Sequence, residues 1–272
     1  MSARHVRYQL LTAATLLIGL VPVPLALAIG EPAQLAGGYF GWGLGVELAA
    51  AGGTIIAATT FKPGDLQRPG WFLLAASYLS FAALLLFVGP RPAGLYQAPP
   101  SSGWAIFTAN MAWSVFAVAG FVVLSRAWRG SGLDLSSPAA RIVSRAVALG
   151  LALLLAGPDL VERFPVALTG DPVAIADCFT DVLDGALFVV AVPVMRAALA
   201  LGGGLVAWPW VLLTASVAAW LGYDAVAVYG DAAGLDGRTV RIAEEVFKSL
   251  GATCTLTAGM AQRWVMTDAA ER

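Results

Sequence analysis

Three aspartates recur at helical spacing within an apolar stretch in the second half of the chain. Asp177, Asp181 and Asp184 stand at positions i, i+4 and i+7, which places their carboxyl groups on one face of a helix. Charged side chains are costly inside a bilayer, and those that occur there usually serve ions, protons or ligands. These three residues are therefore candidate binding residues.

A second charged set follows nearer the C-terminus. Arg241, Glu244, Glu245 and Lys248 stand at i, i+3, i+4 and i+7, again largely on one helical face, and Asp224 precedes them in the neighbouring apolar stretch. Several carboxylates cannot share a low-dielectric site fully ionised, so some must be paired, protonated or in contact with a bound cation. The predicted binding site comprises Asp177, Asp181, Asp184, Asp224, Glu244, Glu245 and Lys248.

The composition excludes several kinds of chemistry. The chain has a single histidine, His5, which excludes zinc–histidine sites, bis-histidine haem and Ser-His-Asp catalysis. A net charge of −1 without a basic run argues against nucleic acid as a partner. The oxygen ligands would suit Ca²⁺, Mg²⁺ or Mn²⁺, but their spacing matches no defined metal loop, so metal and cofactor stay open. No catalytic set is identified, and we do not expect an enzyme.

The elements that must position these residues are membrane-spanning helices. Of the 272 residues, 59% are apolar and only 12% are charged, whereas soluble domains have about 45–50% and about 25%. A spanning helix needs about 20 mostly apolar residues. We therefore predict an all-α integral membrane protein, with Thr239 capping the last helix. Eight stretches qualify: 9–29, 36–60, 71–90, 103–125, 142–158, 172–200, 207–229 and 239–265.

The first stretch has a second interpretation. Arg4 and Arg7, followed by an apolar run and the small residues 26–28, also resemble a signal peptide. Cleavage there would leave seven spans, and the sequence does not decide between the two. With the N-terminus inside, 11 of the 16 basic residues fall on the cytoplasmic side. We therefore expect both termini in the cytoplasm, in the inner (plasma) membrane, with the acidic residues toward the outer face.

Two parts of the chain match one another. The segment Trp71–Ser77 lines up with Trp210–Ser216 in the pattern W-x-L-L-x-A-S, at corresponding places in the predicted span order. We interpret this match as an internal duplication: residues 1–130 form one four-helix repeat, and residues 131–272 form another that carries the acidic site. Because each unit holds an even number of spans, the repeats are expected to be parallel.

These features favour a small transporter or an ion- or proton-coupled permease. Its expected partners are the lipid bilayer, a small cation, proton or cationic solute, and partner membrane subunits. The alternative is a non-transporting protein: a membrane sensor or receptor, or the anchoring subunit of a larger complex. A purely structural role also stays open, in which Lys248 bridges to Glu244 and to an aspartate of 172–200 and so holds two helices together.

One segment resembles a known family. The stretch Glu245–Gly251, with Lys248 at its centre, is similar to the last helix of microbial rhodopsins, in which a lysine carries retinal. The resemblance implies a retinal-type photoreceptor that uses Lys248. It covers one helix only, and the eight predicted spans and the missing counter-ion motif of the third helix depart from that family.

Overall fold

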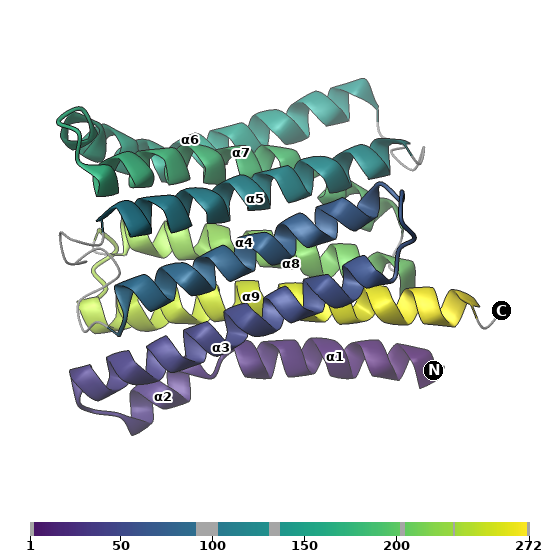
Figure 1. The fold of residues 1–272 in the computed structure, drawn as a ribbon, viewed down its shortest axis with the longest axis horizontal. Coiled ribbons are helices and arrows are strands. Elements are labelled where there is room, and N and C mark those ends of the chain that lie inside the picture. Colours follow the sequence, from purple (N-terminus) through teal and green to yellow (C-terminus); the bar gives the residue numbers. More distant parts are fainter. Residues whose placement is uncertain (1–2, 91–102, 131–136, 202–204, 231, 271–272) are drawn as a thin grey trace.

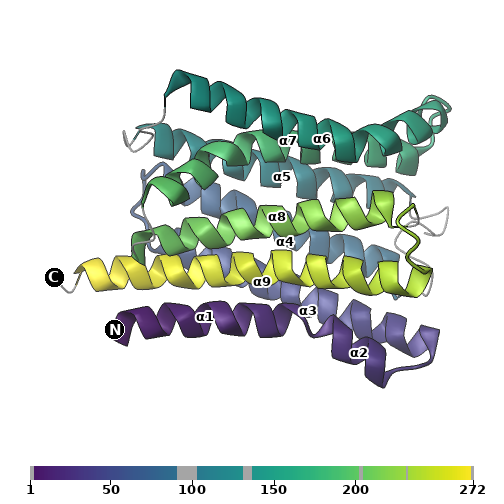
Figure 2. The ribbon, with the colours of Figure 1, turned by 180° about the vertical axis from the view of Figure 1, so that it is seen from behind.

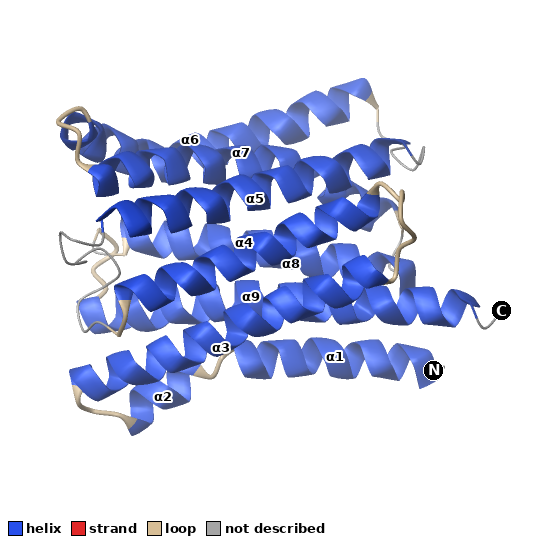
Figure 3. Ribbon diagram, viewed as in Figure 1, coloured by secondary structure: helices blue, strands red, loops and turns tan. Residues whose placement is uncertain are grey.

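The computed structural model is a bundle of long helices that run side by side, seen from opposite sides in Figures 1 and 2. It describes residues 3–90, 103–130, 137–201, 205–230 and 232–270. Within these residues all regular structure is helical, as Figure 3 shows, and no strand occurs. The predicted all-α fold class is confirmed.

The helices are separated mostly by short connections. In chain order they are α1 (Ala3–Gly19), α2 (Pro22–Ala28), α3 (Pro32–Thr59), α4 (Gln67–Val88), α5 (Gly103–Gly130), α6 (Pro138–Ala167), α7 (Pro172–Ala200), the 3₁₀ turn η2 (Leu205–Ala207), α8 (Trp208–Tyr229) and α9 (Gly237–Ala270). Several begin on proline, which is favoured at the first position of a helix because its missing N–H has no helical acceptor there.

Seven helical stretches of the described chain are long and apolar enough to cross a membrane. The first combines α1 and α2 over Val6–Ala28, and the others are α3, α4, α5, α6, α7 and α8 with its preceding turn. Their length and composition support a multi-pass membrane protein. They coincide with the first seven predicted stretches to within a few residues at most ends.

Two of the predicted stretches differ from the helices of the structure. The first stretch is interrupted near Leu20, where Pro22 begins α2. The fifth was expected to end at residue 158, but α6 continues to Ala167 and contains both Pro158 and Pro165. A helix within a membrane protein tolerates proline where neighbouring groups satisfy the backbone. The extra turns matter because they bring Asp159 and Arg163 into the bundle.

Helix α9 is long but falls outside the seven apolar stretches. It runs between α1 and α8 in Figure 2 and also packs against α3. Its buried side chains include Ser249, Thr253, Thr255 and Thr257. All four hydroxyls hydrogen-bond to neighbouring helices, for example Thr15 Oγ1 to Thr257 Oγ1 at 2.9 Å. The eighth predicted stretch is therefore a helix whose polar groups face protein.

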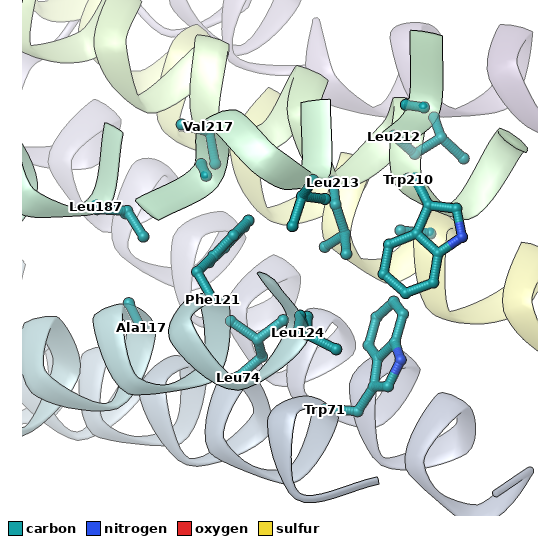
Figure 4. Packing of buried hydrophobic residues seen from close by; sticks show 14 of the residues in the cluster. Trp71, Leu74, Ala117, Phe121, Leu124, Leu187, Trp210, Leu212, Leu213 and Val217 are labelled. Atoms are coloured by element: carbon teal, nitrogen blue, oxygen red, sulfur yellow. The ribbon is translucent and has the colours of Figure 1, made fainter. Parts of the chain in front are cut away.

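The main apolar core lies among α4, α5, α7 and α8. Figure 4 shows Trp71 of α4 facing Trp210 of α8 across this core, with ring centroids 6.0 Å apart. Trp128 of α5 packs edge-on against Trp210 at 4.8 Å. Leu124 and Leu213 are fully buried beside them. Since lipid offers no hydrophobic driving force between helices, this close van der Waals packing is what holds the bundle together.

Helices α3 and α9 approach one another most closely at glycines. A Cβ added to Gly53 would lie 2.7 Å from the carbonyl oxygen of Leu256, and one added to Gly259 would overlap the carbonyl group of Gly53. Small residues at a helix crossing let the two backbones come together. This contact sets the spacing between α3 and α9, and the charged residues Arg241, Glu245 and Lys248 of α9 lie beside α3.

Candidate functional site

A cavity of about 280 Å³ lies among α4, α5, α6, α7 and α8, with α9 contributing Glu244. Carboxyl groups from four helices line it. Of the seven predicted site residues, five line this cavity: Asp177, Asp181 and Asp184 of α7, Asp224 of α8 and Glu244 of α9. The i, i+4, i+7 spacing in α7 accounts for the position of its three aspartates on one wall.

The extended α6 adds two charged groups that the prediction left out of the site. Arg163 Nη1 lies 2.8 Å from Asp177 Oδ2, and Arg163 Nη2 lies 3.3 Å from Asp159 Oδ2. They were missed because the fifth stretch was expected to end at residue 158. The cavity wall therefore contains six carboxyl groups and one guanidinium group.

Polar atoms in this cavity lack partners within the described part of the protein. Asp181 Oδ2 and Thr180 Oγ1 are buried and form no hydrogen bond there. A buried polar atom costs free energy unless something pairs with it, so these two atoms can bind an ion, a ligand or water that enters the cavity. Both lie on the wall that carries Asp177 and Asp184.

The cavity also has an aromatic wall. The ring centroids of Phe81 and Trp113 are 4.8 Å apart, those of Trp113 and Trp220 are 5.2 Å apart, and those of Trp220 and Tyr223 are 5.7 Å apart. All four residues line the cavity with the carboxyl groups. Aromatic faces attract cations, most strongly those that lose water on binding. Acidic and aromatic groups together suit an organic cation.

The other two predicted residues, Glu245 and Lys248, lie on a different side of α9. Lys248 Nζ is 2.5 Å from Glu245 Oε2, and both side chains are almost completely buried. They line a separate space of about 20 Å³ between α3, α4 and α9. The predicted residues thus divide between two places.

Arg241 connects these two places. Its Nη2 lies 2.8 Å from Glu245 Oε1, and its Nη1 lies 3.4 Å from Glu244 Oε2. One guanidinium group therefore contacts a carboxylate that lines the acidic cavity and another that pairs with Lys248. We call Arg241, Glu245, Lys248 and the nearby Glu47 the α3–α9 cluster.

Glu47 of α3 is fully buried. Neither of its carboxyl oxygens has a hydrogen-bond partner among the described residues. One turn earlier on α3, a Cβ added to Gly43 would lie 3.7 Å from Lys248 Nζ, so the lysine reaches this face of α3. A signal was present in the sequence, because Glu47 is the one charged residue of the stretch 36–60.

The described residues contain no group of three or more histidine, cysteine or acidic side chains arranged to hold a metal ion. Lys248, the residue of the rhodopsin-like segment, is engaged with Glu245 beside the smaller space.

Comparisons with protein-family models, with curated proteins and with solved structures give no match. The function is therefore inferred from the geometry of the two charged places.

Proposed function

We propose that this chain is a multi-pass inner-membrane transporter that binds a small organic cation in the acidic cavity. The observation that carries the proposal is the composition of the cavity wall, where six carboxyl groups and one guanidinium group lie beside five aromatic side chains. Arg241, outside the wall, contacts only Glu244 among these carboxyl groups. Such a wall is incompletely neutralised by protein, and an ammonium group would supply the missing charge.

The positions of the acidic residues support access from the outer face. Helices α7 and α9 both begin at the end of the bundle opposite to the start of α1 and the end of α9, as Figure 1 shows. Asp177 lies in the second turn of α7, and Glu244 lies in the second or third turn of α9. With both termini in the cytoplasm, as proposed from the basic residues, the cavity would face outward.

Equivalent hydrogen bonds support the proposed duplication. Ser77 Oγ of α4 donates to the carbonyl oxygen of Trp113 in α5 at 2.9 Å. Ser216 Oγ of α8 donates to the carbonyl oxygen of Gly251 in α9 at 2.8 Å. The two serines are the last residues of the matching segments, so each half joins its third and fourth helices in the same way. We propose two parallel four-helix repeats, of which the second supplies most of the acidic wall.

Two kinds of cavity residue, acidic and aromatic, would contact different parts of the cation. Asp181 and Asp184 would face the ammonium group, because Arg163 already occupies Asp177 and Asp159. Trp113 and Trp220 would contact the alkyl groups and contribute cation–π attraction. Transport further requires that the same cavity open alternately to the two faces, as in other repeat-built carriers.

Tetraethylammonium binding to the purified protein in detergent, measured by calorimetry, tests the proposal. Asp184→Asn and Asp181→Asn should each weaken binding about tenfold or more, which is about 1.4 kcal/mol. Trp113→Leu should also weaken it, whereas Trp104→Leu, on the same helix but 67% exposed and outside the cavity, should not. If tetraethylammonium does not bind, or if the aspartate variants bind it equally well, the proposal is wrong.

Flux through proteoliposomes distinguishes the transporter from its alternatives. Uptake of labelled tetraethylammonium that is lost in Asp184→Asn would support transport. Tight binding without flux would instead support a sensor or receptor. Equal loss of folding in both aspartate variants would support a structural role for these residues.

A further inference from the structure

Glu47 has no part in the cation site proposed above, yet it is the most completely buried acidic side chain described, with an exposed fraction of 0%. We propose that Glu47 is a proton-binding site whose proton is exchanged for the cation in the acidic cavity, through Arg241. The proton site stands on the α3–α9 cluster alone, whereas the exchange rests on the proposed function.

Charge balance in the cluster explains why Glu47 would hold a proton. Arg241 and Lys248 supply two positive charges, and Glu244 and Glu245 take both of them up in short contacts. A third, ionised carboxylate would stay buried without a hydrogen bond, which costs several kcal/mol. A proton on Glu47 removes that charge, so that the two positive charges of Arg241 and Lys248 are balanced by Glu244 and Glu245.

The groups around Glu47 come from each helix that packs on α3. From α9 these are Lys248 and Glu245, and from α4 it is Tyr78, which interacts electrostatically with Glu47. The hydroxyl of Tyr78 is hydrogen-bonded with Thr255 Oγ1 at 2.6 Å. Helix α2 carries no titratable side chain. Lys248 is thus the one cationic group of these neighbours that can change the charge state of Glu47.

Arg241 provides the link between the two places. A cation bound at Asp181 and Asp184 lies in the cavity that Glu244 also lines, and its charge weakens the attraction of Glu244 for Arg241, which leaves Arg241 to Glu245. Glu245 then holds Lys248 less strongly, and the ammonium group of Lys248 can turn toward Glu47. A carboxyl group beside an unpaired ammonium group favours its ionised form, so Glu47 releases its proton. One positive charge enters and one leaves, which keeps the buried charge constant.

Infrared difference spectroscopy tests the proton site without any ligand. A protonated carboxyl group has a C=O stretching band that a carboxylate lacks. At about pH 7, the wild type should show such a band that disappears in Glu47→Gln and shifts in Glu47→Asp. Glu162→Gln, which replaces an exposed carboxyl group of α6, is the matched control and should leave the band unchanged. A wild-type spectrum identical to that of Glu47→Gln overturns the proton site.

Glu244→Gln tests the link, because it imitates neutralisation of Glu244 by a cation. The protonated fraction of Glu47 at about pH 7 should fall by about half or more in this variant. An unchanged band overturns the link to Arg241, whatever the ligand of the cavity is.

Calorimetry with tetraethylammonium in two buffers of different ionisation enthalpy tests the exchange. The wild type should release a proton for each cation bound, and Glu47→Gln should bind the cation without release. Binding to the wild type without proton release overturns the exchange. Absence of binding contradicts the proposed cation site instead, and the infrared results on Glu47→Gln and Glu244→Gln still decide the proton site and its link.

Discussion

The acidic cavity and the α3–α9 cluster use the same residue types in opposite ways. The cavity encloses about 280 Å³, and its six carboxyl groups outnumber the two guanidinium groups that contact them, Arg163 in the wall and Arg241 at Glu244. The cluster borders a space of about 20 Å³, and its ion pairs are as short as 2.5 Å. Buried charge in a helical bundle is therefore either paired within the protein or left to pair with an ion or ligand that enters. Space and charge balance together separate a binding site from a coupling element.

The largest effect is expected in the cluster, where charges are matched. Lys248→Met leaves Glu245 without its closest partner in a place that is 1% exposed, and should destabilise the protein by about 3 kcal/mol. Thermal unfolding in detergent measures the loss. The double variant Lys248→Met/Glu245→Gln should recover most of it, because Arg241 then no longer has to balance two buried carboxylates alone. Equal stability of the single and double variants would mean that the pair is not a stabilising unit.

The second largest effect on stability is expected at the glycine contact between α3 and α9, which positions the cluster. Gly53→Ala places a Cβ 2.7 Å from the backbone of α9 and should cost about 2 kcal/mol by forcing α3 and α9 apart. Gly52→Ala is the neighbouring control, since nothing lies within 4 Å of its Cβ position, and it should keep or slightly raise stability. Thermal unfolding of both variants checks this, and a similar change in both would refute the close crossing.

A smaller effect on stability is expected in the cavity, where charges are unmatched. Arg163 is 30% exposed, so Arg163→Gln should cost only about 1 kcal/mol even though it contacts Asp177 and Asp159. The same change removes the one guanidinium group of the wall and should tighten tetraethylammonium binding about tenfold. Calorimetry and unfolding on the same sample measure both. Weaker binding would show that Arg163 shapes the site rather than competes for it.

The smallest effect is expected outside both regions, at the start of α9. The Asp236 carboxylate accepts hydrogen bonds from the hydroxyl and N–H of Thr239 and from the N–H of Arg238. These bonds, above all the one from the Thr239 hydroxyl, hold the pKa of Asp236 below its ordinary value. A carboxyl group with a pKa lowered by folding stabilises the protein above its unfolded pKa, and this stability is lost as the pH falls through the folded pKa. The wild type should lose a small part of its stability as the pH falls below about 4, the ordinary pKa of an aspartate.

Asp236→Asn keeps the cap but cannot titrate, so it should lack this part of the pH dependence. Denaturation of both proteins across the same pH range makes the comparison. These bonds also correct one expectation: we predicted Thr239 as the cap of the last helix, but the structure gives that place to Asp236, and Thr239 is one of the donors.

Much of the fold could be predicted because it depends on local composition. Apolar runs of sufficient length must form helices in a bilayer, where each backbone group needs a partner within its own segment. The main error was the end of the fifth stretch, which was expected at residue 158 although α6 continues to Ala167. That error concealed the place of Arg163 and Asp159 in the cavity.

The candidate site could be predicted only in part. Helical periodicity placed Asp177, Asp181 and Asp184 on one face, and they do line one wall. Helical periodicity did not predict that Glu244 lines the cavity whereas Glu245 pairs with Lys248. Adjacent residues on a helix point about 100° apart, so the choice of neighbouring helices sends one into the cavity and the other toward Lys248.

The amino-acid sequence alone predicted the long apolar helices of a multi-pass membrane protein and the acidic groups buried among them, because both follow from residue type and short-range spacing. Only the tertiary structure brought Glu47 beside Lys248, from opposite halves of the chain, and gathered carboxyl and aromatic groups of different helices around one space. Contacts between helices depend on which faces pack together, and at Gly53 and Gly259 that packing is decided by backbone approach.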